Sequence, residues 1–223
     1  MNPIAGILAY FQSLYASPKA KELSSGSYAK SLKYGNPNMS VHQFIYSVLL
    51  AFISTLAFAQ APLVDSPLPA LTIADRGELL MEKGDFSFRP WSTEHNPGKV
   101  HIVQYFGATK SDSELFKPFT DLLQDSLGVG KYHVTTIVNL DAAVWGTSSF
   151  VISELKSNKR KYPLSTIVLD QEGSGIGRWK LGEEGAGLAI IDQEGVVRYF
   201  TKTAMTDAEM DASLDLVKAR VDS

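Results

Sequence analysis

Apolar positions that alternate or cluster divide the chain after residue 70 into strands. Residues 100–106 are VHIVQYF and residues 132–139 are YHVTTIVN, and both runs are rich in the branched and aromatic residues that favour strands. Shorter runs at 165–170, 188–192 and 196–201 are also strand-like. Gln193-Glu194-Gly195 separates the last two runs, so we expect these to form a hairpin.

A helical period separates the first two strands. Apolar residues three and four apart define one helix face over residues 111–127, and Ser111 or Asp112 can cap the start. Pro118 lies inside this pattern and should kink the helix, because proline has no amide hydrogen for the intrahelical bond. The predicted apolar face consists of Leu115, Phe116, Phe119, Leu122 and Leu123.

Two more helices follow the second strand. The first spans residues 147–160 and ends in Lys159-Arg160-Lys161, a basic run that we expect to be solvated at a helix end that favours cations. The last helix begins at Thr206-Asp207-Ala208-Glu209, which is a capping box. Its apolar face consists of Met210, Leu214, Val217 and Val221.

The order of the elements predicts the fold class. Leu71-Thr72-Ile73 leads into a turn at residues 75–79 with alternating flanks, which predicts an N-terminal hairpin. Strand–helix–strand units require a parallel pair, whereas the closing hairpin adds antiparallel strands. The pattern predicts an α/β, thioredoxin-like three-layer sandwich, with a mixed central sheet, helices on both faces and an N-terminal β-hairpin extension.

The first 59 residues follow a different pattern. Residues 44–59 are FIYSVLLAFISTLAFA, a run shorter than the about 20 apolar residues of a membrane-spanning helix. The run ends in Ala57-Phe58-Ala59, a small-x-small sequence that favours signal-peptidase cleavage. We therefore predict a signal peptide at 39–59, cleavage after Ala59, and an exported thioredoxin-like domain at 60–223 without a stable membrane anchor. A buried core helix or an uncleaved anchor is the alternative.

Residues 1–38 show no sustained periodicity, and we interpret them as an upstream extension outside the fold. Translation would then start at Met39. One feature weighs against this start, because the shortened leader has no Lys or Arg before its apolar run and only His42 there.

Composition excludes several functions. The chain of 223 residues has no cysteine, so disulfides, thiol nucleophiles, and iron–sulfur and Cys-type zinc sites are excluded. Four of its 21 Lys and Arg and one of its 24 Asp and Glu precede residue 60. The mature chain therefore has 17 basic and 23 acidic residues, a net charge of −6, which argues against nucleic acid as a partner.

Several segments resemble known families. Gly98-Lys99-Val100 and Phe106–Thr109 resemble the strand that precedes the active-site helix in exported thioredoxin-like proteins, and Leu188–Gly195 resembles their closing hairpin. The mature chain as a whole is similar to the YtfJ family of periplasmic proteins from Gram-negative bacteria, which have a thioredoxin-like fold and no characterised function. The matching stretches are Asp75–Leu79, Trp91, Thr135–Asn139 with Asp141, Ser157–Lys159 with Tyr162-Pro163, Trp179, Glu183-Glu184, and Ile191-Asp192 with Gly195.

The resemblance locates a degenerate redox site. Thioredoxin-like oxidoreductases place a Cys-x-x-Cys pair at a helix start, where the helix dipole and free N–H groups stabilise the thiolate. Counting from Phe106–Thr109 puts the two positions at Ser111 and Glu114, and counting from Pro118 puts them at Lys110 and Ser113. The cis-proline that faces the pair in these folds corresponds to Ala186.

The residues at this helix start could support non-thiol catalysis or anion binding. A non-thiol enzyme could use Thr109, Ser111, Ser113 and Glu114, but a serine needs an activating base, and His95, His101 and His133 are better interpreted as packed or edge residues. Free N–H groups at the helix start could instead hold an anion. Helix capping is the simpler interpretation of residues 111–113.

Calcium could bind the two Asp-Gln-Glu-Gly sequences through Asp170 and Glu172 or through Asp192 and Glu194, although turn formation explains both. Residues 173–177, GSGIG, lack the setting of a phosphate loop, and we expect a flexible connection. We therefore predict a redox-inactive, exported binding or interaction module without a cofactor. Its expected partner is another periplasmic protein or a small ligand; the alternative is the non-thiol enzyme.

Overall fold

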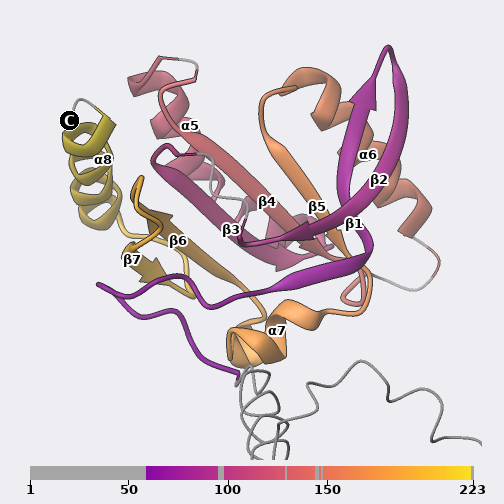
Figure 1. Ribbon diagram of the computed structural model, residues 1–223, viewed down its shortest axis with the longest axis horizontal. Helices are drawn as coiled ribbons and strands as arrows, with labels where there is room; N and C mark the ends of the chain where they lie inside the picture. The colour runs from indigo at the N-terminus through magenta and orange to yellow at the C-terminus, as the bar shows by residue number, and fades with distance from the viewer. Residues whose placement is uncertain (1–58, 95–97, 129, 144–145, 147, 222–223) are drawn as a thin grey trace, which may run out of the picture. The chain divides into compact units, whose positions relative to one another are not determined.

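The computed structural model describes residues 59–94, 98–128, 130–143, 146 and 148–221 (Figure 1). These residues belong to one compact unit, Ala57–Ser223. The predicted upstream extension and all of the predicted signal peptide except Ala59 lie outside the described residues, as do His95 and Thr147. No helix in the described ranges is long and apolar enough to cross a membrane.

Seven strands form one mixed sheet in the order β2-β1-β5-β4-β3-β6-β7. Three central strands are parallel, an antiparallel pair extends the sheet beside β3, and a second antiparallel pair extends it beside β5. This arrangement confirms the predicted mixed sheet and thioredoxin-like fold class. The strands are β1 (Thr72–Glu82), β2 (Asp85–Ser92), β3 (His101–Gly107), β4 (His133–Asn139), β5 (Thr166–Asp170), β6 (Gly187–Ile191) and β7 (Val197–Thr201).

The hairpin turn predicted at residues 75–79 is wrong, because the chain forms a bulge there and β1 continues through it. Arg76 and Gly77 have φ values of 56° and 70°. A Cβ atom on Gly77 would lie 2.2 Å from the carbonyl oxygen of Arg89, so only glycine fits. The chain reverses later, at Lys83-Gly84, between β1 and β2. The turn-forming residues therefore bend the strand instead of ending it.

The first predicted helix is divided into α4 (Lys110–Glu114) and α5 (Lys117–Ser126). Pro118 lies in the first turn of α5. Proline is well tolerated there, since the amides of a first helical turn have no intrahelical acceptor. The chain therefore breaks before Pro118, whereas the sequence predicted a kink at that residue.

The other two predicted helices are present as α6 (Ser148–Lys161) and α8 (Asp207–Val221). The capping box of α8 is confirmed. The backbone N–H of Thr206 donates to Glu209 Oε2 over 2.8 Å, and the N–H of Glu209 donates to Thr206 Oγ1 over 3.3 Å. These bonds satisfy two amides that have no acceptor within the helix.

The basic end of α6 is only partly solvated, so that prediction is wrong for one of its three residues. Lys159 is 7% exposed, and its Nζ donates to the carbonyl oxygens of Pro163 and Ser165 over 3.2 and 2.5 Å. Burial is the main cause that lowers its pKa. Lys159 thus holds the loop between α6 and β5.

The segment expected to be a flexible connection forms a short helix, α7 (Ser174–Arg178). The Asp170 carboxylate accepts the backbone N–H groups of Ser174 and Gly175 over 3.0 and 2.9 Å. A Cβ atom on Gly175 would lie 2.2 Å from Cε2 of Tyr105, so glycine allows α7 to pack directly on the sheet. A 3₁₀ turn, η2 (Gly182–Glu184), follows.

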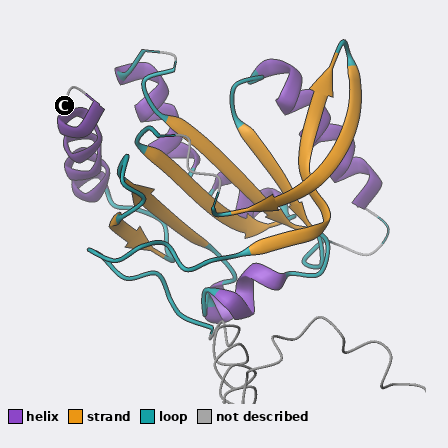
Figure 2. Ribbon diagram, in the orientation of Figure 1, coloured by secondary structure: helices purple, strands orange, loops and turns teal. Residues whose placement is uncertain are grey.

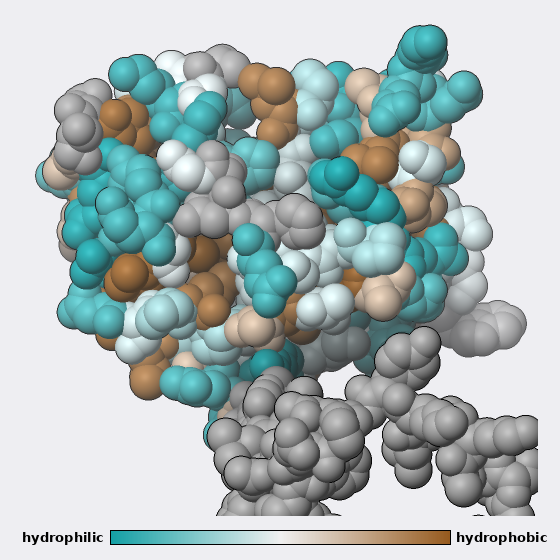
Figure 3. Space-filling view, in the orientation of Figure 1, coloured by the Kyte–Doolittle hydropathy of each residue, from teal (hydrophilic) through white to brown (hydrophobic). Residues whose placement is uncertain are grey.

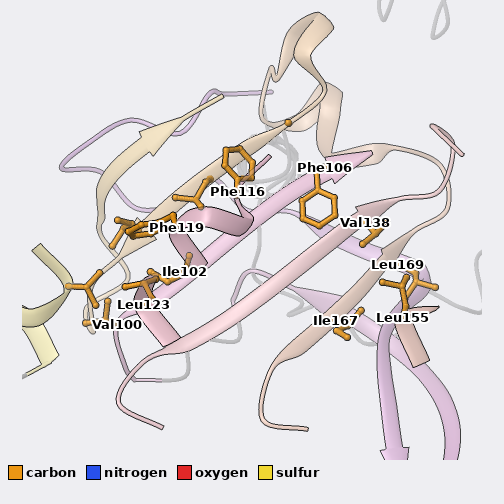
Figure 4. Close-up of a cluster of buried hydrophobic side chains, with 14 of the residues drawn as sticks. Val100, Ile102, Phe106, Phe116, Phe119, Leu123, Val138, Leu155, Ile167 and Leu169 are labelled. Atoms are coloured by element: carbon orange, nitrogen blue, oxygen red, sulfur yellow. The ribbon is translucent and has the colours of Figure 1, made fainter. Parts of the chain in front are cut away.

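Alternate residues of the central strands supply two apolar clusters, one on each face of the sheet. Side chains of α5, α6 and α8 pack in the first cluster, where Figure 4 shows Phe116 and Phe119 beside residues of the strands. The second cluster contains residues of α7, β1 and β2, and of the segment before β1. Helices therefore cover both faces, as predicted, but three long helices cover one face and the short α7 covers the other (Figure 2).

Candidate functional site

The helix entrance, residues 109–114, uses its hydroxyl groups locally. Thr109 is the N-cap, with Oγ1 accepting the backbone N–H of Asp112 over 3.2 Å, so the prediction that Ser111 or Asp112 caps this helix is wrong. Ser111 Oγ shares a 3.0 Å hydrogen bond with Thr109 Oγ1. Ser113 Oγ donates to the carbonyl oxygen of Lys110 over 2.8 Å. These bonds stabilise the short helix.

The described histidines lie far from these hydroxyl groups. His101 begins β3, and the helix entrance follows the last residue of β3, so a strand length of about 20 Å separates them. His133 pairs with His101 in the sheet and lies at the same end. Within the described ranges, no histidine or carboxylate side chain hydrogen-bonds Ser111 or Ser113. Among the described residues, therefore, no side-chain base is hydrogen-bonded to either serine to activate it.

A carboxylate already lies at the helix entrance. A Cβ atom on Gly107 would be 2.4 Å from Asp112 Oδ2, which places this carboxylate against the end of β3. Its negative charge opposes the binding of an anion there. Glu114, the remaining candidate, is exposed at the last position of α4. Ala186, at the position of the missing proline, is 3% exposed and packs in the core.

The two acidic turns lie at opposite ends of the sheet, because β6 runs antiparallel to β3 whereas β5 is parallel to β4 and β3. Glu172 and Glu194 are exposed, whereas Asp170 and Asp192 are buried. Asp192 accepts hydrogen bonds from the Glu194 amide and from Arg198 Nε over 3.1 and 2.6 Å. In the part of the chain that the structure describes, no three His, Asp or Glu side chains gather to hold a metal ion.

Two histidines, His101 buried and His133 half-buried, form a pair at the start of β3 and β4. The rings of His101 and His133 meet edge to face with centroids 5.1 Å apart. Nε2 of His101 bonds Thr135 Oγ1 over 2.8 Å, and Nε2 of His133 bonds Thr166 Oγ1 over 2.9 Å. Burial, with a smaller contribution from the charge of His133, lowers the pKa of His101 to about 3. Burial also lowers the pKa of His133, so both rings are neutral at physiological pH.

An open groove of about 260 Å³ lies at this end of the sheet. Four segments form it: the chain before β1, the end of β2, the start of β3 and the turn between β6 and β7. Trp91, Val103 and Ile191 are each at most 5% exposed and supply an apolar floor. The lining residues are Pro67, Leu68, Ala70, Trp91, Thr93, Glu94, His101, Val103, Ile191, Glu194 and Gly195.

The segment that forms one wall of the groove is held against α7. Trp179 Nε1 donates to the carbonyl oxygen of Pro69 over 2.9 Å, and Arg178 Nε donates to that of Ala70 over 2.6 Å. The backbone N–H of Gln60 donates to the Arg178 carbonyl oxygen over 3.0 Å. These bonds hold this wall of the groove against α7.

Hydrophobic side chains elsewhere form small separate patches on the face that Figure 3 shows. The large exposed hydrophobic residues come from several different elements, and the groove is therefore the better candidate for a binding site. Those among the described residues are Leu63, Val64, Phe88, Phe150, Tyr162 and Leu164.

Comparison with known proteins identifies the family. The sequence model of a family described as a bacterial protein of unknown function, YtfJ_HI0045, matches residues 63–220. The chain belongs to this family. The uncharacterized YtfJ protein of Escherichia coli K12 is 34% identical over 152 residues, which cover 68% of this chain and 83% of that protein. An uncharacterized protein of Haemophilus influenzae is 26% identical over 176 residues, covering 78% and 96% respectively.

Solved structures resemble the YtfJ-family chain at low sequence identity. A thiol:disulfide interchange protein from Bacteroides is 14% identical, with a TM-score of 0.45 and coverage of 73% of this chain and 92% of that one. A thiol-disulfide isomerase from Corynebacterium glutamicum is 15% identical, with a TM-score of 0.44 and coverage of 71% and 96%. Similarity at this level does not indicate an activity for this chain, which has no cysteine.

Residues that indicated the YtfJ family occupy constrained positions in the structure. Arg76 and Gly77 form the bulge of β1, Trp179 holds the segment before β1, and Trp91 lies in the floor of the groove. The groove was not predicted from the sequence. No local motif could indicate it, because its residues come from four separate segments.

Proposed function

We propose that this YtfJ-family protein is an exported, non-catalytic binding module that holds a ligand or partner in the groove at the start of β3. Its cysteine-free chain excludes thiol–disulfide exchange by its own side chains. The thioredoxin-like fold then serves as a rigid scaffold that positions binding residues from several segments.

Export to the periplasm is part of this proposal. It rests on the uncharged run at 44–59 and on the small-x-small sequence that ends at Ala59. The family match supports it, since the match begins at residue 63, four residues after the proposed cleavage site. Intact mass and N-terminal sequencing of the protein from a periplasmic fraction test the proposal. A chain that starts at Gln60 supports it, and an uncleaved chain contradicts it.

The contrast between the two ends of the sheet favours binding over catalysis. At the helix entrance, the hydroxyl groups of Thr109, Ser111 and Ser113 are engaged in local hydrogen bonds. At the other end, Trp91 and Val103 form the floor of an open groove with a fixed wall. Apolar floors with a few polar groups are typical of ligand sites.

A pair of matched variants tests whether the groove binds. Ala70 is exposed and lines the groove, whereas Ala74 is exposed and does not line it. The mature chain is screened by NMR against a library of small organic fragments. We expect that the fragments that bind the wild type also bind Ala74→Phe, and that they lose binding to Ala70→Phe, whose ring fills the groove. Equal binding to both variants, or no binding to the wild type, would contradict the proposal.

A further inference from the structure

The described lining residues make the groove acidic, because they include two glutamates and no Lys or Arg. Among the residues that the structure describes, its ionisable lining residues are Glu94, Glu194 and His101. His101 is 7% exposed and bonded to Thr135, and its burial favours the neutral ring. At neutral pH, the lining residues that the structure describes therefore have two negative charges and no positive charge.

The two groove carboxylates are available to a ligand. Both residues are exposed, and no hydrogen bond or ion pair among the described residues uses the carboxylate of Glu94 or Glu194. The neighbouring cation, Arg198, is already bound, because it contacts Asp192 over 2.6 Å and Asp65 over 2.7 Å. The rim of the groove thus offers free hydrogen-bond acceptors to a positively charged group.

The floor of the groove suits an apolar or aromatic group, because Trp91, Val103 and Ile191 line it. The volume of about 260 Å³ lies just below the range of roughly 300–1,000 Å³ that is usual for drug-sized ligands. The dimensions therefore favour a small molecule.

We propose that the groove binds a small amphipathic organic cation: an amine whose ammonium group lies at Glu94 and Glu194 and whose apolar part lies on Trp91. This inference rests on the proposed binding function and specifies its ligand class. Charge complementarity selects the cation, and the apolar floor selects against a fully hydrated ion.

Phenethylamine and phenylacetate form a matched pair of probes, because they share the ring and differ in the sign of their charge. Each is titrated into the mature chain by NMR, with the indole signal of Trp91 assigned through Trp91→Phe. We expect phenethylamine to shift the Trp91 signal and phenylacetate to bind at least about tenfold more weakly. The double variant Glu94→Gln, Glu194→Gln should lower the affinity for phenethylamine by about fivefold, as expected for exposed charge pairs. Glu82→Gln and Glu172→Gln, exposed carboxylates outside the groove, should leave it unchanged.

The possible outcomes separate the two proposals. Phenylacetate binding at Trp91 as tightly as phenethylamine would overturn the ligand class and leave the groove as a binding site. Failure of both probes, together with failure of the fragment library, would overturn the groove as well. A lysine-containing tetrapeptide that binds at least tenfold more tightly than phenethylamine would also overturn the assignment, in favour of a protein segment.

Discussion

The hydroxyl group of Tyr105 donates a 2.9 Å hydrogen bond to Asp170 Oδ2, and both side chains are buried. The same carboxylate accepts two backbone amides of α7. One buried charge therefore joins β3, β5 and α7. Removing a partner from such a charge leaves part of its desolvation cost uncompensated.

Tyr105→Phe should therefore destabilise the domain at residues 60–223 by about 1.5–3 kcal/mol, the usual loss for a hydrogen bond to a charged group. Urea unfolding followed by circular dichroism measures this loss. Tyr162→Phe is the control, since Tyr162 is 40% exposed, and it should change stability little. A loss at Tyr105 no larger than the loss at Tyr162 would show that Asp170 does not depend on the tyrosine.

Two glycines of α7 should respond oppositely to alanine. A Cβ atom at position 175 meets the ring of Tyr105 at 2.2 Å, so Gly175→Ala should cost about 1–3 kcal/mol through overpacking. A Cβ atom on Gly177 would have no atom from outside its own helix within 4 Å. Gly177→Ala should therefore be neutral or stabilise the domain by up to about 1 kcal/mol. Thermal unfolding of both variants tests the prediction, which equal shifts would contradict.

The capping box of α8 can be tested by a conservative replacement. Glu209→Ala removes the acceptor for the Thr206 amide and should cost about 1 kcal/mol. Glu209→Gln keeps an acceptor oxygen and should retain most of that stability. Chemical unfolding distinguishes the two. If both variants lose the same stability, the charge of Glu209 matters more than its hydrogen bond.

The pair of His101 and His133 predicts sensitivity to mild acid. His101 has a folded-state pKa of about 3, and burial also lowers that of His133, so the unfolded chain binds more protons below its own histidine pKa of about 6.5. The contribution of the neutral histidines to the free energy of unfolding is therefore fully present above pH 6.5, and it falls as the pH decreases toward 3. His101 alone should contribute about 1.4 kcal/mol per pH unit in this window.

Urea unfolding at several pH values between 7.5 and 5 measures the slope, where most carboxylates remain ionised. NMR titration of the histidine ring protons provides an independent check in the same range. The His101 signal should not titrate there. A His101 signal with a midpoint near 6.5 would contradict the buried, neutral ring.

Local sequence patterns predicted much of the fold. The capping box at Thr206 and Glu209 and the turn at 193–195 depend on neighbours in the chain, and both are present in the structure. The runs at 100–106 and 132–139 are rich in branched and aromatic residues, which predicted strands of a buried sheet. In the structure, their alternate side chains enter two separate apolar clusters. These features could be predicted because their causes lie within a few residues.

Contacts between residues that are far apart in the sequence determine the features that were not predicted. The glycine-rich segment at 173–177 forms α7 because Asp170 accepts its amides and Tyr105 leaves room only for glycine. Lys159 is buried because the carbonyl groups of the following loop bind its ammonium group. The groove is lined by four segments that lie apart in the sequence. The cap at Thr109 was missed because Ser111 and Asp112 are equally good capping residues by type.

Chemical-shift mapping tests most directly whether the molecule binds at the groove or at the helix entrance. The fragments that bind the wild-type mature chain are titrated into isotope-labelled protein, and the shifted backbone amides are located. We predict the largest changes at Trp91, His101 and Val103, with their loss in Ala70→Phe. Changes centred on residues 110–114 that persist in Ala70→Phe would contradict the account and would indicate binding at the helix entrance.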